Sequence, residues 1–213
     1  MIKDHFHTRA SEWDKGTIRV AGAKKIADAI SLHVELNDEM EILDFGVGTG
    51  LLGFEIAKYT KKVYGVDTSA NMIETLHSKN TPELSIEGYC QDIIKEPLEK
   101  SFDGLVSSMT LHHIEDLKLF FQTIYKNIND GGFIAIADLE KEDGTFHSDN
   151  EGVFHFGFDK DALCQIVLDA GFVHVEFRTI NTINKPHKDF NIFLLSAKKI
   201  ALRRAYKKND LIF

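Results

Sequence analysis

Short apolar runs alternate with stretches of helical period along most of the chain. Runs of strand length fall at residues 41–45, 62–66, 84–89, 102–107, 133–138, 173–180 and 191–197. The early runs are almost uninterrupted, as expected of parallel strands that are buried on both faces. Strands that alternate with helices in this way predict an α/β protein with a doubly wound sheet and right-handed crossovers.

Helices are predicted between these strands from apolar spacing and from capping residues. Residues 116–129 repeat apolar side chains at intervals of three and four, which places those side chains on one helix face. Residues 159–170 begin with an aspartate cap and stop before Gly171, whose type suits the left-handed position after a helix. Further helices are expected at residues 6–13, 17–36 and 69–78.

The strongest local signal is a glycine-rich loop between the first strand and the next helix. Asp44 lies in that strand, and Gly46, Gly48 and Gly50 follow it at alternate positions. Glycine allows a sharp turn and lets a ligand approach the main chain. Residues 48–53 match the dinucleotide fingerprint, whereas residues 44–50 match the pattern acid-x-Gly-x-Gly-x-Gly of a loop for S-adenosylmethionine. Spacing alone leaves both cofactors open.

Asp44 favours S-adenosylmethionine. A dinucleotide brings a pyrophosphate dianion to such a loop, and a carboxylate two residues before the first glycine would repel it. S-adenosylmethionine carries an ammonium and a sulfonium but no phosphate, so an acid beside the loop is favourable. The alternative for Asp44 is a structural capping role.

A second acid indicates a nucleoside. Asp67 ends the second strand, 17 positions after Gly50, near the offset at which an acid binds a ribose diol. Both cofactors have such a ribose, so Asp67 does not choose between them. The alternative is that Asp67 caps the helix predicted at 69–78.

The ordered motifs resemble those of the class I S-adenosylmethionine-dependent methyltransferases. The resemblance runs over roughly residues 40–197 and is carried by four segments in the family's order: 42–50, 65–72, 90–93 and 102–113. It implies a Rossmann-like, seven-stranded, mostly parallel sheet with helices on both faces and an antiparallel last strand. It also implies S-adenosyl-L-methionine as cofactor and S-adenosyl-L-homocysteine as product.

The resemblance assigns cofactor roles residue by residue. Asp44 and the backbone of the three loop glycines would hold the methionine end, and Asp67, with Thr68 beside it, would bind the ribose. The adenine and the sulfonium would be contacted by residues from three further segments: Met72, Asp92, Ile93, Ser108 and Met109. A core position for Met72 and a helix cap for Asp92 are the alternatives.

Histidines are the candidates for acceptor chemistry. Methyl transfer is an in-line displacement that depends mainly on positioning, so a general base is optional. His112 and His113 follow the fourth strand, at the sheet edge where ligands bind, and either could orient or deprotonate an acceptor. They could equally cap or pack the next turn.

A long segment without regular pattern, residues 139–158, holds a second group of aromatic and histidine side chains. Such a segment is typical of a functional lid, although alternate aromatics could also form a short covering strand. His155 is a further catalytic candidate, and it lies among Phe146, His147, Phe154, Phe156 and Phe158. The histidine spacing requires no metal, and none is expected.

The chain is expected to form a single domain in three parts. Residues 1–36 would be N-terminal helices covering the site, residues 37–197 the cofactor-binding core, and residues 198–213 a basic tail. Arg9 and Trp13 share a face of the first helix and could help to close the site. An amphipathic packing helix is the alternative for this segment.

Charge and composition limit the classes of partner that the protein is expected to bind. The net charge is -8, and the tail holds six cations and one acid, so residues 1–197 carry -13. An acidic body disfavours nucleic acid and anionic membranes. No apolar run is long enough to span a bilayer, no secretory signal is visible, and two cysteines make no disulfide framework, so a cytoplasmic location is expected.

A small molecule is therefore the expected acceptor. The fourth strand lacks the Asn/Asp-Pro-Pro-aromatic motif that nucleobase and glutamine methyltransferases share, and neither cysteine is placed as a cytosine C5 nucleophile. Two alternative functions stay open: an NAD-dependent oxidoreductase, and a catalytically silent nucleoside-binding module. The sequence predicts neither the acceptor nor the oligomeric state.

Overall fold

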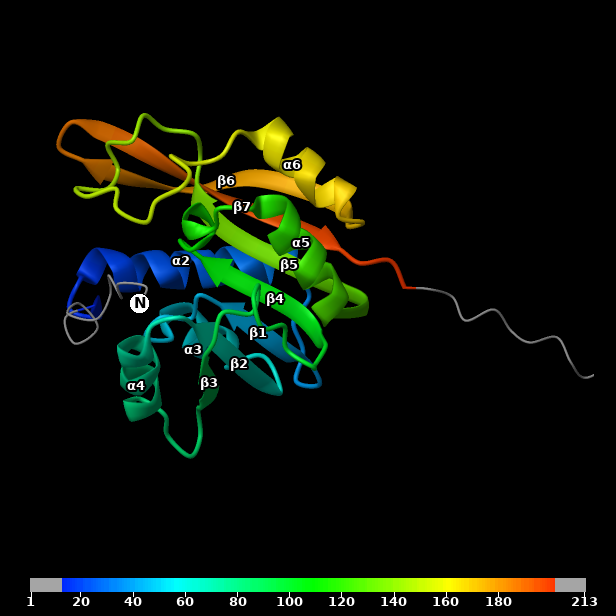
Figure 1. Cartoon of the computed structure of the whole chain (residues 1–213). Coiled ribbons are helices and arrows are strands. Elements are labelled where there is room, and N and C mark those ends of the chain that lie inside the picture. Colours follow the sequence, from blue (N-terminus) through cyan, green and yellow to red (C-terminus); the bar gives the residue numbers. More distant parts are fainter. Residues whose placement is uncertain (1–12, 202–213) are drawn as a thin grey trace, which may run out of the picture.

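The computed structural model describes residues 13–201 and is built around a seven-stranded sheet (Figure 1). The strand order is β3-β2-β1-β4-β5-β7-β6. The strands run as follows: β1 Glu41–Phe45, β2 Lys62–Asp67, β3 Ile86–Cys90, β4 Phe102–Ser108, β5 Ile128–Leu139, β6 Val173–Lys185 and β7 Lys188–Lys198.

Strand directions confirm the predicted mostly parallel sheet. β1 pairs in parallel with β2 and β4, and the parallel pairing extends to β3 on one side and to β5 on the other. β7 is antiparallel to both β5 and β6. The antiparallel last strand is therefore inserted between its two neighbours, as the motif resemblance implies.

The terminal hairpin is longer than predicted. β6 and β7 continue beyond the apolar runs at 173–180 and 191–197, because residues 181–185 pair with residues 188–192. This outer part alternates partly buried and exposed side chains, so it has no apolar run to mark it. Lys198 completes β7, and Lys199 Nζ donates to the backbone oxygens of Tyr125 and Ile128. Residues 202–213 lie outside the described residues.

The helices begin mostly where the caps predict. The Ser69 side chain accepts a hydrogen bond from Met72 N, and Asp116 and Asp159 cap their helices in the same way. The helices of the described chain are α2 Thr17–His33, α3 Leu51–Ile56, α4 Ala70–Ser78, the 3₁₀ turn η1 Leu111–His113, α5 Leu117–Asn127 and α6 Lys160–Asp169.

Two predicted helix ends are wrong, and one predicted helix is not described. α5 stops at Asn127 rather than at 129, because Ile128 already pairs with Phe102 as the start of β5. α2 stops at His33 rather than at 36, where the chain turns extended. Of the helix expected at 6–13, all but Trp13 lies outside the described residues.

Helices cover both faces of the sheet, as predicted (Figure 1). α2, α3 and α4 pack on one face in a core that includes Ile42 and Val106. α5 and α6 pack on the other face in a core that includes Leu43 and Leu105. Successive strand residues thus enter opposite cores, which explains why the inner strands read as uninterrupted apolar runs.

Candidate functional site

The glycine loop, residues 46–50, leaves one open position at the carboxyl edge of the sheet. Gly46, Gly48 and Gly50 all have positive φ, at 68°, 51° and 86°. A Cβ atom on Gly46 would come within 2.2 Å of Thr110, and one on Gly50 within 2.8 Å of Phe54. A Cβ atom on Gly48 would meet nothing within 4 Å. The loop therefore packs tightly at its two ends and is open to a ligand at Gly48.

Asp44 is a buried carboxyl group beside this loop. Its residue is 1% exposed, and Oδ2 accepts no hydrogen bond from the described residues. A Cβ atom on Gly53, in α3, would lie only 2.8 Å from that oxygen. Burial, with a further contribution from the charge of Asp67, raises the pKa of Asp44 well above its usual range and outweighs the opposing effect of the Gly53 backbone N–H. A carboxyl group in this state favours its protonated form unless a cation lies nearby.

Asp67 joins the glycine loop to the start of α4. Its Oδ2 accepts from Gly48 N at 2.9 Å, and its Oδ1 accepts from Ser69 N at 2.9 Å. The capping role considered for Asp67 is thus present in the structure. Thr68 beside it is exposed, whereas Met72 in α4 is 2% exposed.

Asp92 caps a turn after β3. Its Oδ1 accepts from Ile94 N at 3.1 Å, and its Oδ2 accepts from Lys95 Nζ at 2.7 Å. Partial burial acts to raise the pKa of Asp92, but these hydrogen bonds outweigh it and the pKa is lowered. The side chain of Ile93 is buried in the α5–α6 core, so its backbone is the part that could face a ligand.

The end of β4 lies directly against the glycine loop. Thr110 Oγ1 contacts Gly46 O at 3.4 Å and Ser108 O at 3.1 Å. Met109 takes φ of 55°, and its N–H donates to Ala137 O of β5 at 2.8 Å. A positive φ is uncommon for a residue with a side chain, and such strain concentrates at functional sites. Ser108 and Met109 thus lie at the end of β4, next to the residue that contacts the loop.

His112 forms a buried pair with Asp138, which follows from no local motif. His112 is 1% exposed, and its Nδ1 lies 2.8 Å from Asp138 Oδ1. The backbone N–H of His112 donates to Asp138 Oδ2 at 3.1 Å. Because a carboxylate oxygen accepts, Nδ1 carries the proton and Nε2 has the free lone pair. Nε2 is buried and has no partner among the described residues.

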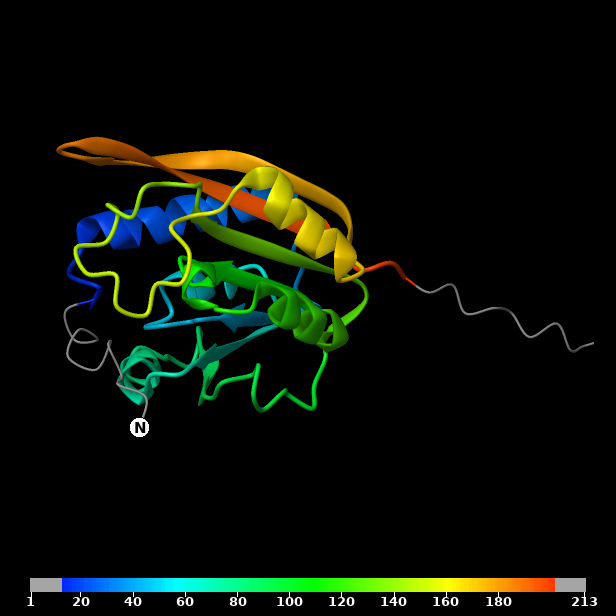
Figure 2. The same ribbon diagram turned by 45° about the horizontal axis from the view of Figure 1, so that its top comes forward.

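His113 and His155 hold the segment between β5 and α6, residues 140–158, against η1. His113 Nδ1 donates to Gly152 O at 2.7 Å, and His155 Nε2 donates to Ile114 O at 2.8 Å. The N–H groups of Phe154 and His155 donate to His112 O. This long loop lies at the same end of the sheet as the start of α2 (Figure 2).

His147 comes from the 140–158 segment and packs over His112. The two ring centroids are 4.8 Å apart, and His147 Nε2 is also buried without a partner among the described residues. Burial, followed by the charges of His112 and His113, lowers the pKa of His147 to about 4. His147 is therefore neutral at neutral pH. The sequence placed it in the aromatic group but assigned it no partner.

The aromatic side chains of the 140–158 segment lie in different environments, some exposed and others buried. Phe154 and Phe156 are 52% and 44% exposed, whereas Phe158 is 5% exposed and belongs to the core. Phe146 packs on Phe190 of the terminal hairpin, with ring centroids 5.2 Å apart. The segment forms no covering strand apart from a single bridge between residues 140 and 158.

The residues just before α2 reach the glycine loop. Asp14 Oδ1 accepts from Thr49 Oγ1 at 2.6 Å, and Asp14 Oδ2 accepts from Lys79 Nζ at 2.6 Å. The Arg19 guanidinium stacks over Trp13 at 4.3 Å from the ring centroid. α2 itself lies on the sheet face against α3 and the terminal hairpin. Arg9 lies outside the described residues.

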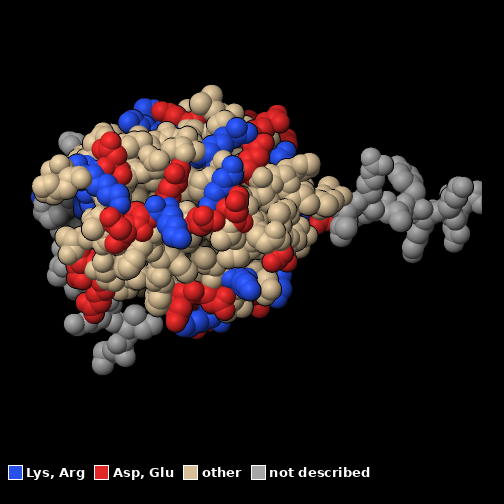
Figure 3. Space-filling model, turned by 90° about the horizontal axis from the view of Figure 1, so that it is seen from above, with Lys and Arg blue, Asp and Glu red and all other residues tan. Residues whose placement is uncertain are grey.

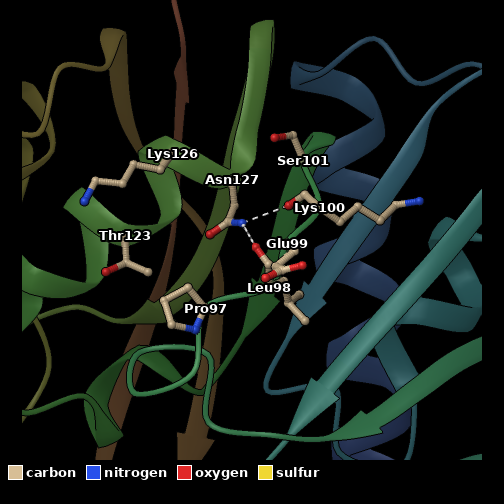
Figure 4. A pocket seen from close by; sticks show the side chains of 8 residues that line it. All are labelled: Pro97, Leu98, Glu99, Lys100, Ser101, Thr123, Lys126 and Asn127. Carbon is tan, nitrogen blue, oxygen red and sulfur yellow. Dashed lines mark hydrogen bonds between the residues drawn. The ribbon is translucent and has the colours of Figure 1, made fainter.

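A shallow pocket of about 250 Å³ lies at the opposite edge of the sheet (Figure 4). Residues 97–101, which precede β4, line it together with Thr123, Lys126 and Asn127 of α5. Asn127 Nδ2 donates to the backbone oxygens of Leu98 and Lys100, which fixes the pocket's floor. None of the predicted site residues lines it.

Among residues 13–201, no group of three or more His, Cys, Asp or Glu is arranged to hold a metal ion. No helix in the same range is long and apolar enough to cross a membrane.

Comparison with known sequences points to one family. Residues 43–136 match the model of a methyltransferase domain. An uncharacterised methyltransferase of Schizosaccharomyces pombe is 30% identical over 158 residues, which cover 64% of this chain and 55% of the relative. Phosphoethanolamine N-methyltransferase 1 of Arabidopsis thaliana is 32% identical over 168 residues, covering 76% of this chain and 34% of that one. The chain thus spans about half or less of these relatives.

Solved structures share the fold. The complex of DhpI with S-adenosylhomocysteine superposes with a TM-score of 0.73 at 16% identity, covering 92% of this chain and 94% of that one. Phosphoethanolamine N-methyltransferase 2 of Haemonchus contortus, bound to S-adenosyl-L-methionine, gives a TM-score of 0.66 at 18% identity, covering 82% and 52%. The fold and the sequence match over residues 43–136, from β1 into β5, together identify a methyltransferase domain of the class I, S-adenosylmethionine-dependent type in this chain.

Proposed function

We propose that the chain binds S-adenosylmethionine at the glycine loop and transfers its methyl group to a small-molecule acceptor by in-line displacement. The observation that carries this proposal is Asp44, a buried carboxyl group whose Oδ2 has no partner among the described residues, beside a loop that is open at Gly48. A ligand that brings cationic groups and no phosphate to this loop relieves the buried acid.

The residues present fit this ligand. Asp44 and the backbone of Gly46, Gly48 and Gly50 hold the methionine end, next to the open position of the loop. Asp67 binds the ribose hydroxyls with Thr68 beside it, because its carboxylate lies at the end of β2 and already contacts the loop through Gly48 N.

The adenine and the sulfonium are held by the neighbouring strand ends. In this proposal, Met72 and the backbone of Ile93 border the adenine, and Asp92 accepts from its amino group. Ser108 and Met109 line the space beneath the sulfonium, since the β4 turn lies against Gly46 through Thr110. The bound group supplies an electrophilic methyl carbon; the chain supplies position and excludes water.

The acceptor side is formed by η1 and the 140–158 segment. His113 and His155 tie that segment to η1 and so shape the acceptor space, while His112 lies beneath it. On the face in Figure 3, Lys and Arg side chains are interspersed with Asp and Glu rather than gathered in a patch of one sign. This face of the molecule therefore offers no continuous basic track for a polyanion.

An NAD-dependent oxidoreductase fits the site less well. A pyrophosphate at this loop would place its negative charges near Asp67 and would favour the protonated form of Asp44, so neither carboxyl group would stabilise it. A silent nucleoside-binding module would keep the same loop, so turnover rather than binding distinguishes it from an enzyme.

The proposal is tested by product formation. The protein is incubated with S-adenosylmethionine and, in turn, small amines, hydroxyl compounds, thiols and carboxylates, and S-adenosylhomocysteine is quantified. We expect product that depends on one acceptor class. Cofactor binding without product from any class would indicate the silent module, and absence of cofactor binding would reject the proposal.

A further inference from the structure

The 140–158 segment and η1 enclose two side-chain nitrogens that the fold leaves without partners. His112 Nε2 and His147 Nε2 are both buried, and among the described residues neither makes a hydrogen bond. Buried polar atoms are nearly always satisfied, so two such atoms on rings 4.8 Å apart require an explanation. A ligand that can both donate and accept a hydrogen bond would satisfy both.

Asp138 determines what His112 offers to such a ligand. Asp138 is fully buried on β5 and holds the His112 ring at 2.8 Å. This fixes the proton on Nδ1, leaves the Nε2 lone pair inward, and stabilises the imidazolium that would form if Nε2 took a proton. The pair therefore has the arrangement of a general base and its orienting carboxylate.

The surrounding charges favour a neutral hydroxyl over an ammonium group. Asp138 already accepts three hydrogen bonds, from His112 Nδ1, His112 N and Leu139 N. His147 is neutral at neutral pH, and the charge of Lys185, which donates to Phe146 O on the same segment, also disfavours a cation there. His113 packs beside the His112 ring and donates to Gly152 O. Asp138, the buried carboxylate at this pair, is therefore already engaged and would not hold an ammonium group.

We propose, on the basis of the proposed methyltransferase function, that His112 is the catalytic base and that the acceptor is a phenolic hydroxyl. The hydroxyl donates to His112 Nε2. As its oxygen bonds to the methyl carbon, the O–H proton passes to Nε2, and the electron pair of the broken C–S bond stays on sulfur. The products are a methyl ether, S-adenosylhomocysteine and a His112 imidazolium paired with Asp138.

The choice of a phenol follows from proton affinity. A phenolic hydroxyl loses its proton at about pH 10. An imidazole can accept this proton when the transfer is concerted with bond formation to the methyl carbon. The proton of a water-like hydroxyl, at about 15.7, is much harder to remove. The exposed rings of Phe154 and Phe156 on the covering segment also suit an aromatic acceptor.

The probe is 4-nitrophenol, whose phenolate absorbs visible light and whose neutral form does not. Calorimetry first establishes that S-adenosylhomocysteine binds to the wild type, to His112→Gln and to the control His187→Gln, which changes an exposed histidine in the turn between β6 and β7. 4-Nitrophenol is then added to each complex at about pH 6. We expect the phenolate band to be at least ~3-fold larger for the wild type and the control than for His112→Gln.

Methylation of the same probe gives a second measurement. Loss of a general base lowers the rate by about 10²–10⁴-fold, so His112→Gln should lose that much kcat while the control keeps it. Equal rates, equal bands, or no band with the wild type would overturn the assignment of base and acceptor. Failure of the wild type to bind S-adenosylhomocysteine would instead reject the proposed function itself, and this inference with it.

Asp138 is a positioning residue, and nitrogen NMR of the imidazole tests it without an assay. In the wild type at neutral pH we expect the His112 ring to be protonated on Nδ1, and Asp138→Asn should shift the population toward Nε2–H. A wild-type ring protonated on Nε2 would contradict the proposal. This wild-type measurement stands even if the Asp138→Asn variant does not fold.

Discussion

Asp44 is the residue whose charge state depends most directly on the proposed ligand. Burial, followed by the charge of Asp67, raises its pKa, so the folded protein keeps this proton to a higher pH than the unfolded chain does. Its contribution to the free energy of unfolding therefore falls as the pH rises from about 4 toward the raised pKa. A bound cation reverses the preference and favours the carboxylate.

We accordingly expect S-adenosylmethionine binding to release protons and to strengthen as the pH rises through the same range. Calorimetry in buffers of different ionisation enthalpy measures the protons exchanged. Asp44→Asn, which keeps the shape and removes the charge, should weaken binding and abolish this proton release. Proton uptake by the wild type, or identical behaviour of the variant, would contradict the role given to Asp44.

Gly46 and Gly48 form a matched pair because they share positive φ but differ in surroundings. Gly46→Ala would drive a Cβ atom into Thr110 and should lower the free energy of unfolding by about 2 kcal/mol or more. Gly48→Ala places its Cβ atom in open space, so it should lower the free energy of unfolding by only about 1 kcal/mol. The same atom would block the ligand, so cofactor affinity should fall at least ~10-fold.

Thermal unfolding and calorimetry on both variants measure these effects. If Gly48→Ala kept its cofactor affinity, the loop would not be part of the binding site.

Asp67 has a structural role in the fold and, in the proposed function, a second role in binding the ribose. Asp67→Ala should weaken S-adenosylmethionine binding by about 1–3 kcal/mol, the cost of losing hydrogen bonds to a charged group. It also removes the acceptors of Gly48 N and Ser69 N, so the melting temperature should fall. Calorimetry on the folded variant measures the first effect; unchanged affinity there would refute the ribose assignment.

At the scale of elements, Asp14, which lies just before α2, connects this part of the chain to the glycine loop. Asp14 bonds Thr49 of the loop and Lys79 after α4, and the side chains of this ion pair are 29% and 34% exposed. Partly exposed pairs of this kind contribute about 1 kcal/mol or less to stability. The contact supports the proposal that residues 1–36 cover the site.

Asp14→Ala should therefore leave the melting temperature almost unchanged and speed cofactor dissociation by about 5-fold. Asp28→Ala is the control, because it also removes one Asp–Lys ion pair, the one with Lys24 on α2. Stopped-flow displacement of bound S-adenosylmethionine measures the rates. Identical dissociation from both variants would show that the Asp14 contact does not retain the ligand.

The elements themselves were predictable where local signals define them. Apolar runs located the inner strands, and Ser69, Asp116 and Asp159 marked helix starts that the structure confirms. The outer half of the β6–β7 hairpin was missed because its pairing depends on its partner strand rather than on its own apolar pattern. The end of α5 was missed because Ile128 is apolar in register with the helix but is taken by β5.

For the molecule as a whole, the two sides of the site differ in how far the sequence predicts them. The proposed cofactor side consists of short segments at strand ends, so motif order is enough to group Asp44, the glycine loop and Asp67, which the structure also holds close together. The acceptor side is assembled across the chain: Asp138 meets His112 from another strand, and His147 arrives on a long loop. Contacts between residues this far apart in the chain leave no local sequence pattern from which they could be predicted.

The family fold also explains why binding must be measured before acceptors are sought. One sheet edge carries the glycine loop, Asp67 and the His112–Asp138 pair, but the fold hosts many chemistries, and only the site defines the reaction. The central claim is that the acid-lined loop takes a cationic, phosphate-free nucleoside.

The most direct test is calorimetric titration of the full chain with S-adenosylmethionine, S-adenosylhomocysteine and NAD in parallel. We predict micromolar dissociation constants for the first two, which correspond to a binding free energy of about -8 kcal/mol, and no measurable binding of NAD. Binding of NAD alone, or of none of the three, would contradict the account.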